Sequence, residues 1–129
     1  MSDTKLNLIA GEWMAGESEI ENRNPSDLSD LVGVYAQAST AQLDATLDQA
    51  RIAQAEWANY GIERKQAVLN AIGNEMMARA EELGTLLSRE EGKPLAEGKG
   101  EVFRAGQFFT YYAAECLRQI GENADSVRP

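Results

Sequence analysis

The sequence predicts an α+β fold in which a short antiparallel β meander is followed by three amphipathic helices. Short β-prone runs separated by turn residues occupy positions 5–38. From Ser39 onward the apolar residues recur every three or four positions, which is the period of a helix with one buried face. The chain has 129 residues, of which 43% are hydrophobic, so it suits one packed domain or a large part of one.

Three short strands are expected within positions 5–38. They lie in the runs KLNLIAGEW, where Leu6 and Leu8 alternate with polar residues, ESEIENRNP and DLVGVYAQA. Turn residues around Gly16 and Pro25 separate the runs. A meander of this size is not stable in isolation, so we expect another part of the protein to cover one of its faces.

The first helix is expected to begin after Ser39. The run STAQ matches a capping box, in which the Ser39 side chain bonds the backbone of Gln42 and the Gln42 side chain bonds that of Ser39. Apolar residues then recur at helical spacing as far as Trp57, and Gly61 is placed to end the helix.

Two more helices follow in the sequence pattern. The second is expected from Ile62 to about Arg89, because Gly92 and Pro94 would interrupt it. The third is expected to start near Pro94, which suits a first helical turn, and to end at Gly121. Its apolar stripe is predicted to contain Val102, Ala105, Phe109, Tyr112, Cys116 and Ile120.

We expect residues 1–129 to form one structural segment. It comprises the meander (5–38), the three helices (39–121) and a tail (122–129). The tail, ENADSVRP, contains no closing element, so it is expected to be a truncated end rather than a finished terminus.

Composition excludes several classes of protein. With a net charge of −9 and no stripe of Lys and Arg, the chain is not expected to bind nucleic acid. No run approaches the roughly 18 apolar residues of a membrane span, and the N-terminus lacks the apolar segment of a secretory signal. A single cysteine, Cys116, forms no internal disulfide, and together these features predict a cytoplasmic protein. The absence of histidine excludes Cys-His and Ser-His-Asp catalysis and most zinc sites.

The run EEGKP does not match a phosphate-binding loop. Such a loop needs a first glycine where Leu87 stands and a hydroxyl residue where Pro94 stands. A helix end followed by a tight turn is the preferred interpretation. The acidic pairs Glu81-Glu82 and Glu90-Glu91 point about 100° apart on a helix, so they are not expected to act as acid and base.

Neither a metal site nor a reactive thiol is predicted. Asp27 and Asp30 lack the loop spacing of a calcium site, although backbone carbonyls remain an alternative source of ligands for a structural cation. Cys116 lies on an apolar stripe near a helix C-terminus, where the dipole does not favour a thiolate, so it is expected to pack as a small hydrophobic residue.

Aromatic residues cover more than one face of the third helix. Phe109 and Tyr112 suit the stripe that packs inward, whereas Phe108 and Tyr111 form a second apolar edge, one turn beyond Arg104. A helix that is apolar on two faces is buried on both, either by other parts of the protein or by a ligand cavity. Core packing is the simpler interpretation, but a guanidinium near aromatic rings would also suit an anionic substrate.

The order of these signals resembles the N-terminal portion of the NAD(P)-dependent aldehyde dehydrogenases, over residues 6–129. The motifs that carry the resemblance are AGEW, RNP and EEGKP, in which Glu90, Gly92, Lys93 and Pro94 are the family-like residues. The run GEVFRAGQFFTYYAAECLRQIGE further resembles the branch that acts on alpha-ketoglutaric semialdehyde (2,5-dioxopentanoate).

The resemblance implies the N-terminal part of an α/β enzyme that oxidises a small aldehyde to the acid with NAD or NADP, as a homo-oligomer. No run here matches the family's catalytic cysteine, general-base glutamate or nicotinamide-binding segment, so the chain alone is expected to be inactive and to bind no cofactor. Lys93 then lies in the connection between two helices and does not bind the cofactor. Cys116, within the run AAECLRQ, is not the catalytic thiol. The resemblance places Arg104, Phe108 and Tyr111 on a helix that lines the substrate tunnel, with Arg104 in reach of a substrate carboxylate.

A free-standing helical module for protein interaction or oligomerisation is the alternative. Three amphipathic helices with exposed apolar faces could also self-associate or hold a partner. Such a module is expected to unfold cooperatively as a defined oligomer, whereas part of a larger enzyme is expected to bind hydrophobic dye and aggregate.

Overall fold

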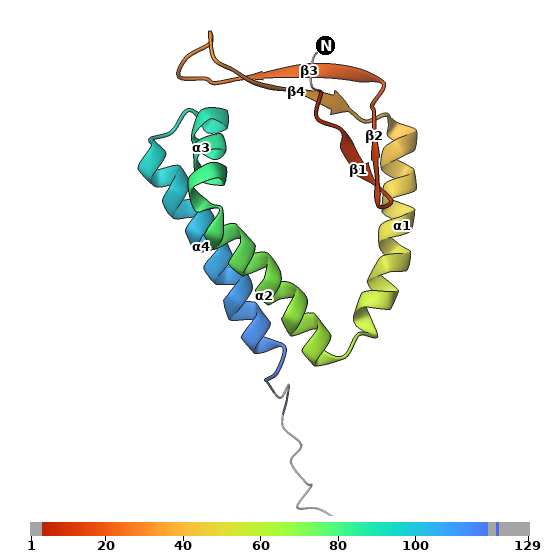
Figure 1. The fold of residues 1–129 in the computed structure, drawn as a ribbon. Helices are drawn as coiled ribbons and strands as arrows, with labels where there is room; N and C mark the ends of the chain where they lie inside the picture. Colours follow the sequence, from red (N-terminus) through yellow and green to blue (C-terminus); the bar gives the residue numbers. More distant parts are fainter. Residues whose placement is uncertain (1–3, 119–120, 122–129) are drawn as a thin grey trace, which may run out of the picture.

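A computed structural model describes residues 4–118 and residue 121 of the chain. In these residues, four strands precede four helices (Figure 1). The α+β class, with antiparallel strands ahead of helices, is confirmed. The elements are β1 (Asn7–Ile9), β2 (Glu12–Met14), β3 (Ser18–Arg23), β4 (Leu31–Gln37), α1 (Thr40–Ala58), α2 (Ile62–Ala78), α3 (Ala80–Glu91) and α4 (Leu95–Glu115).

The strands form two hairpins rather than one three-stranded meander. β1 pairs with β2 and β3 pairs with β4, both antiparallel. The run expected to be the first strand contains both β1 and β2, because Ala10 and Gly11 adopt φ angles of 52° and 88° and reverse the chain in two residues. Positive φ at both central positions is the geometry that suits the twist of a two-residue hairpin. Alanine seldom adopts it, which is why the sequence did not predict this turn.

Helix α1 begins as predicted and ends earlier than predicted. The Ser39 Oγ accepts a hydrogen bond of 3.2 Å from the Gln42 amide, and the Gln42 Oε1 accepts one of 2.9 Å from the Ser39 amide, so the capping box is confirmed. The helix ends at Ala58, with Asn59 as its C-cap, and Gly61 lies at the start of α2 instead of closing α1. No described residue of α1 is buried.

The second predicted helix is divided in two, so four helices replace the expected three. Arg79, with φ −101° and ψ 17°, separates α2 from α3. The hydrogen bonds from the Arg79 amide to the Glu75 carbonyl and from the Leu83 amide to the Arg79 carbonyl persist, so the chain bends without unwinding. The guanidinium of Arg79 binds Glu82 on the far side of the bend. Gly92, in the left-handed region with φ +69°, ends α3, and Pro94 precedes α4, as predicted.

Helix α4 packs along both α2 and α3 (Figure 1), and this contact holds most of the described core. Its buried face consists of small residues with Val102 among them: Gly98, Val102, Gly106 and Ala113. A Cβ on Gly106 would lie 2.8 Å from the Gly73 carbonyl oxygen of α2, so the two backbones approach more closely than larger residues allow. Among the residues that the structure describes, each helix is too short or too polar to span a lipid bilayer.

The C-terminal end of α4 also differs from the prediction. The helix ends at Glu115 rather than at Gly121. Hydrogen bonds between residues three positions apart follow it, from the Leu117 amide to the Ala114 carbonyl and from the Arg118 amide to the Glu115 carbonyl. Such i to i+3 bonds tighten and terminate a helix. Ile120 and the expected tail, 122–129, lie outside the described residues.

Candidate functional site

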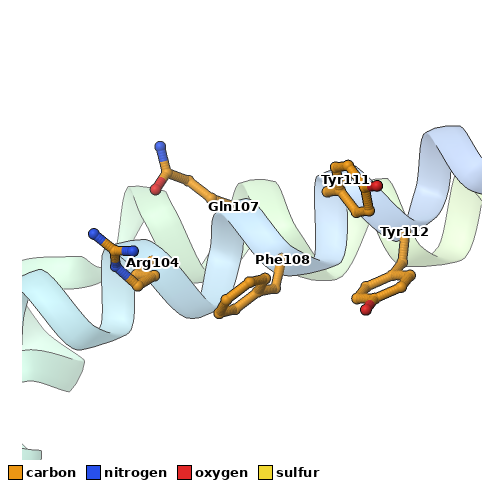
Figure 2. Close-up of a pocket in the computed structure, with 5 residues that line it drawn as sticks. All are labelled: Arg104, Gln107, Phe108, Tyr111 and Tyr112. Carbon is orange, nitrogen blue, oxygen red and sulfur yellow. The ribbon is translucent and has the colours of Figure 1, made fainter.

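The outer face of α4, on the side away from its buried glycines, carries a surface pocket of about 320 Å³ (Figure 2). It is lined by Arg104, Gln107, Phe108, Tyr111 and Tyr112. The structure therefore brings together the three residues that the sequence placed on one face, Arg104, Phe108 and Tyr111. It adds Gln107, which lies three positions after Arg104 and shares its face by helical geometry.

Tyr112 corrects the predicted stripe. It was expected to pack inward with Phe109, but its side chain is 59% exposed and lines the pocket. The inward face of α4 is set by Gly98, Gly106 and Ala113, small residues that a search for large apolar side chains overlooks. The backbone of α2 approaches α4 at Gly106 and that of α3 approaches it at Gly98, so the larger aromatic residues lie on the flanks of the helix.

The aromatic surface is continuous and open. Phe108 and Tyr111 are 57% and 59% exposed, and the rings of Tyr111 and Tyr112 meet edge to face with centroids 5.3 Å apart. A second hollow, of about 260 Å³, is lined by Leu69 of α2 with Phe108, Phe109 and Tyr112. Because Phe108 and Tyr112 line both hollows, the apolar surface extends from α4 onto α2. Contiguous exposed apolar surface of this kind marks a site for a ligand or for another part of a protein.

Arg104 stands at one end of this surface without a partner. Among the described arginines it is the one that makes no ion pair, hydrogen bond or ring contact. Its nearest acidic neighbour on α4, Glu101, is bound by Lys93 at 2.7 Å. The charge of Arg104 is therefore not compensated from within its own helix.

Lys93 lies in the joint between α3 and α4, where two acidic side chains bind it. Its ammonium group contacts Glu91 at 2.5 Å and Glu101 at 2.7 Å, and these bonds, that to Glu101 foremost, raise the pKa of Lys93. The Ser26 hydroxyl donates to the Gly92 carbonyl at 2.7 Å, which fixes the joint against the loop between β3 and β4. EEGKP is thus a helix-to-helix joint, as the sequence predicted.

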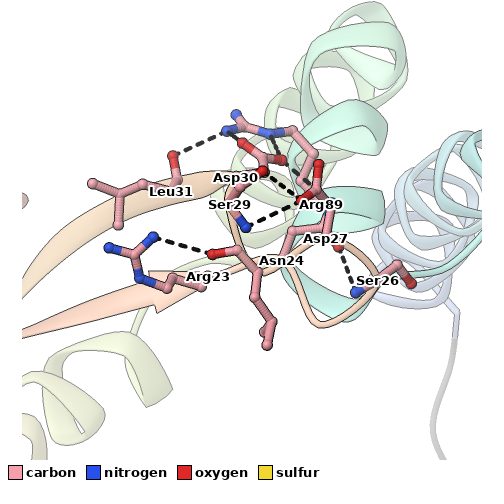
Figure 3. A network of polar contacts seen from close by, with 9 residues as sticks. Arg23, Asn24, Ser26, Asp27, Ser29, Asp30, Leu31 and Arg89 are labelled. Carbon is pink, nitrogen blue, oxygen red and sulfur yellow. Dashed lines mark hydrogen bonds and ion pairs between the residues drawn. The ribbon is translucent and has the colours of Figure 1, made fainter.

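A second polar contact ties the β3–β4 hairpin to α3 (Figure 3). The Arg89 guanidinium donates from Nε to Asp30 Oδ2 at 2.9 Å and from Nη2 to Asp30 Oδ1 at 2.5 Å, and it also reaches the Leu31 carbonyl at 3.1 Å. The bond from Arg89, supported by one from Asn24, lowers the pKa of Asp30. Sequence inspection did not identify this pair, because its members are 59 positions apart and neither belongs to a motif.

The other candidates have structural roles in the described part of the chain. Glu90 accepts a hydrogen bond from Asn22 at 2.9 Å while Glu91 pairs with Lys93, so the two carboxylates diverge. The Cys116 thiol is partly buried and donates to the Tyr112 carbonyl at 3.4 Å. Across the described residues, no group of three or more Cys, Asp or Glu side chains is placed to hold a metal ion.

Comparison with known proteins gives concordant results. The sequence profile of the aldehyde dehydrogenase family matches residues 13–128. Alpha-ketoglutaric semialdehyde dehydrogenase of Bacillus subtilis (strain 168) is 38% identical over 124 residues, covering 93% of this chain and 25% of that protein. Alpha-ketoglutarate semialdehyde dehydrogenase of Haloferax volcanii is 32% identical over 131 residues, covering 100% of this chain and 27% of that protein.

Solved structures agree. An aldehyde dehydrogenase from Brucella melitensis biovar abortus 2308 superposes with a TM-score of 0.88 at 26% identity, over 96% of this chain and 26% of that one. A NAD-dependent benzaldehyde dehydrogenase from Corynebacterium glutamicum superposes with a TM-score of 0.84 at 29% identity, over 97% of this chain and 27% of that one. The chain therefore spans about a quarter of the length of these relatives and matches their N-terminal region. Sequence profile, relatives and fold together show that this chain belongs to the aldehyde dehydrogenase family.

Proposed function

We propose that this chain forms the N-terminal quarter of an NAD(P)-dependent aldehyde dehydrogenase that oxidises a small semialdehyde to the corresponding acid. The outer face of α4 is the observation that carries the proposal, because an unpaired guanidinium beside open aromatic surface suits an anionic, partly apolar ligand. The names of several relatives support the substrate class: they act on alpha-ketoglutaric, N-succinylglutamate 5-, succinate or glutarate semialdehyde.

In this proposal the chain contributes scaffold and part of the tunnel wall. Arg104, Phe108 and Tyr111 face the substrate, while the hairpins and α1 carry contacts to the remainder of the enzyme. Family chemistry proceeds through a thiohemiacetal, transfer of hydride to NAD(P) and hydrolysis of a thioester, and it needs a thiolate, oxyanion donors and a base. These groups are assigned to the remainder of the enzyme, so the chain alone is inactive.

The joint between α3 and α4 does not fit the phosphate groups of a nucleotide. Lys93, the cation beside the glycine of the joint, is already held by two carboxylates. Pro94 occupies the place where a phosphate loop has its hydroxyl residue. Nucleotide binding is therefore assigned to the remainder of the enzyme as well.

The full enzyme is proposed to be a cytoplasmic homo-oligomer. These 129 residues contain a single cysteine and hence no disulfide pair of their own, which supports a reducing compartment. The homo-oligomer rests on membership of the family.

A chimera tests the function. Residues 13–128 of this chain would replace the matching segment of the Bacillus subtilis relative, and reduction of NAD or NADP would be followed with alpha-ketoglutaric semialdehyde. We expect the chimera to turn over the aldehyde and this chain alone to show no activity. Oxidation of aldehyde by the isolated chain, or a folded chimera without activity, would contradict the proposal.

A second candidate is a helical interaction module, and α1 is the observation that favours it. None of its described residues is buried, and the side chains of Leu43, Leu47 and Ile52 are each about half exposed. Sedimentation and thermal unfolding separate the two functions: a module gives a defined oligomer with a sharp transition, whereas part of an enzyme gives heterogeneous association.

A further inference from the structure

We propose that the end of α3 acts as a conformational latch. In this proposal Arg89, Glu90 and Gly92 hold an arm, residues 4–58 with both hairpins and α1, closed against a helical unit, residues 62–118 with α2, α3 and α4. When the latch bonds break, the arm rotates as one piece about the joint at residues 59–61, and the helices of the unit stay folded. The inference goes beyond the proposed function and does not depend on it.

The arm is bonded internally. The Lys5 amide donates to the Val34 carbonyl at 2.8 Å and the Ala36 amide donates to the Lys5 carbonyl at 2.9 Å, so the segment before β1 is joined to β4. The Gln42 side chain of α1 donates to the Ala15 carbonyl at 2.9 Å, and α1 also packs against β1. These bonds connect the two hairpins and α1 with one another, which allows them to move as a single body.

The helical unit also has contacts of its own. Its glycines bring the backbones of α2 and α3 close to that of α4. Lys93 binds Glu91 and Glu101, and the Lys99 ammonium group contacts Glu81 at 2.6 Å, so ion pairs join α3 to α4 as well. None of these contacts involves a residue of the arm. The unit is therefore expected to keep its packing when the arm opens.

The Arg89 guanidinium makes the central contact of the latch (Figure 3). It donates to both carboxylate oxygens of Asp30, at 2.9 and 2.5 Å, and to the Leu31 carbonyl at 3.1 Å. Two bonds between one guanidinium and one carboxylate fix the orientation of the partners as well as their distance. The Arg89 and Asp30 side chains are 38% and 29% exposed, so water reaches them and can replace these bonds when the arm opens.

Two further hydrogen bonds accompany this pair. The Asn22 amide donates to the Glu90 carboxylate at 2.9 Å, and the Ser26 hydroxyl donates to the Gly92 carbonyl at 2.7 Å. Leucines near the latch residues in the sequence are exposed rather than packed between arm and unit: Leu28 is 71% exposed, Leu31 41% and Leu86 40%. Closure of the arm thus depends on polar bonds more than on buried apolar surface, so substitutions of single polar side chains should change it.

The joint between α1 and α2 permits the rotation. Figure 1 shows the two helices diverging from this joint. Gly61 has no atom within 4 Å of an added Cβ, and no side chain caps α2 there. Long side chains make the contacts across the joint: Lys65 donates to the Ala58 carbonyl at 2.9 Å, and the Arg64 guanidinium lies 3.6 Å from the centre of the Tyr60 ring. Such side chains keep the helix ends together over a range of angles, and hinges commonly consist of a few residues of this kind.

Distances between two spin labels, measured by pulsed electron paramagnetic resonance, test the latch. In a chain with Cys116→Ser, the labels would be attached at Ala45→Cys in α1 and Gly100→Cys in α4, two exposed positions. The labelled chain would be diluted in an excess of unlabelled chain, which excludes distances between molecules. With the latch residues intact we expect one narrow distribution of distances.

Arg89→Gln is expected to raise the ratio of open to closed chain by on the order of 10-fold, and its combination with Ser26→Ala to raise it further. The open form appears as a second, broader distribution, while circular dichroism retains the helix signal. Exchanging the charges, Asp30→Arg with Arg89→Asp, should recover part of the closed form. Arg51→Gln, which removes an exposed pair with Asp48 inside α1, is the matched control and should leave the distribution unchanged.

Four results would overturn the latch. A double variant with the same distances as the parent chain shows that other contacts hold the arm, and a broad distribution in the parent chain shows that the arm is not closed. Loss of the helix signal together with the closed distance shows that these bonds stabilise the whole fold. An equal change in the control Arg51→Gln shows that the contact between Arg89 and Asp30 has no particular part in the closure.

Discussion

At the scale of single residues, Gly92 combines two requirements. Its φ of +69° lies in the left-handed region, which a side chain disfavours. A Cβ at this position would also lie 2.6 Å from Ser26 Oγ and 2.8 Å from Pro25 Cγ. Because the Ser26 hydroxyl bonds the Gly92 carbonyl, the joint and the loop between β3 and β4 constrain each other.

Gly92→Ala is therefore expected to lower the free energy of unfolding by about 1–3 kcal/mol, from backbone strain and overlap together. Gly100→Ala is the matched control, since Gly100 lies inside α4 with no atom within 4 Å of an added Cβ. That change is expected to stabilise the chain by about 0.5–1 kcal/mol through helix propensity. Urea unfolding measures both, and equal effects of the two substitutions would contradict the constraint at Gly92.

The pair of Asp30 and Arg89 predicts a pH dependence. Folding lowers the pKa of Asp30 beneath its ordinary value of 3.8, chiefly through the bond from Arg89. The stability that this carboxylate contributes is thus complete above 3.8 and is lost as the pH falls below that value through the folded-state pKa.

Asp30→Asn should consequently lower the melting temperature near neutral pH, and the difference from the parent chain should shrink as the pH falls below 3.8. Asp48→Asn, which removes an exposed pair with Arg51 within α1, is the control and should change the melting temperature little. A difference between Asp30→Asn and the parent chain that is independent of pH would exclude the proposed role of the carboxylate.

At the scale of elements, the contact of α4 with α2 and α3 depends on close backbone approach. A Cβ on Gly84 of α3 would lie 2.5 Å from the Lys99 Cα and 2.7 Å from the Lys99 amide nitrogen. Backbone atoms cannot turn aside as the end of a side chain can, so the helices would have to separate.

Gly84→Ala is expected to destabilise the chain by about 1–3 kcal/mol, despite the higher helix propensity of alanine. Circular dichroism during urea unfolding measures the loss, with Gly100→Ala again as the control. An unchanged or raised midpoint would show that α3 and α4 are less closely packed than the structure describes.

Signals between neighbouring residues were sufficient to predict several ends of helices, whereas contacts between helices and strands could not be predicted from the sequence. The capping box at Ser39 and the stop at Gly92 depend on residues within a few positions, so the sequence indicates them. The turn at Ala10 and the bend at Arg79 have no strong local signal, because alanine and arginine are ordinary in strands and helices.

For the candidate site, helical spacing was sufficient to group Arg104, Phe108 and Tyr111. It misplaced Tyr112, because the inward face is defined by where α2 approaches α4, at Gly73 and Gly106. No pattern in the sequence indicates that Glu101 pairs with Lys93 across the joint rather than with Arg104 on its own helix.

At the scale of the whole molecule, many large apolar side chains of the described residues are exposed, because no other described part of the chain covers them. Phe108, Tyr111 and Tyr112 are open on α4, and α1 stands apart from α2 and α4 (Figure 1) with its leucines exposed. Relatives about four times as long share this fold, which supports a remainder of the enzyme that covers both surfaces.

Binding of a hydrophobic dye to the purified chain tests this central claim most directly. The account predicts strong dye fluorescence, a clear decrease in the double variant Phe108→Gln with Tyr111→Gln, little change in the control Tyr60→Gln, and loss of the signal in the chimera. A chain that binds no dye and unfolds in one sharp transition as a monomer would contradict the claim that these faces need the remainder of an aldehyde dehydrogenase to cover them.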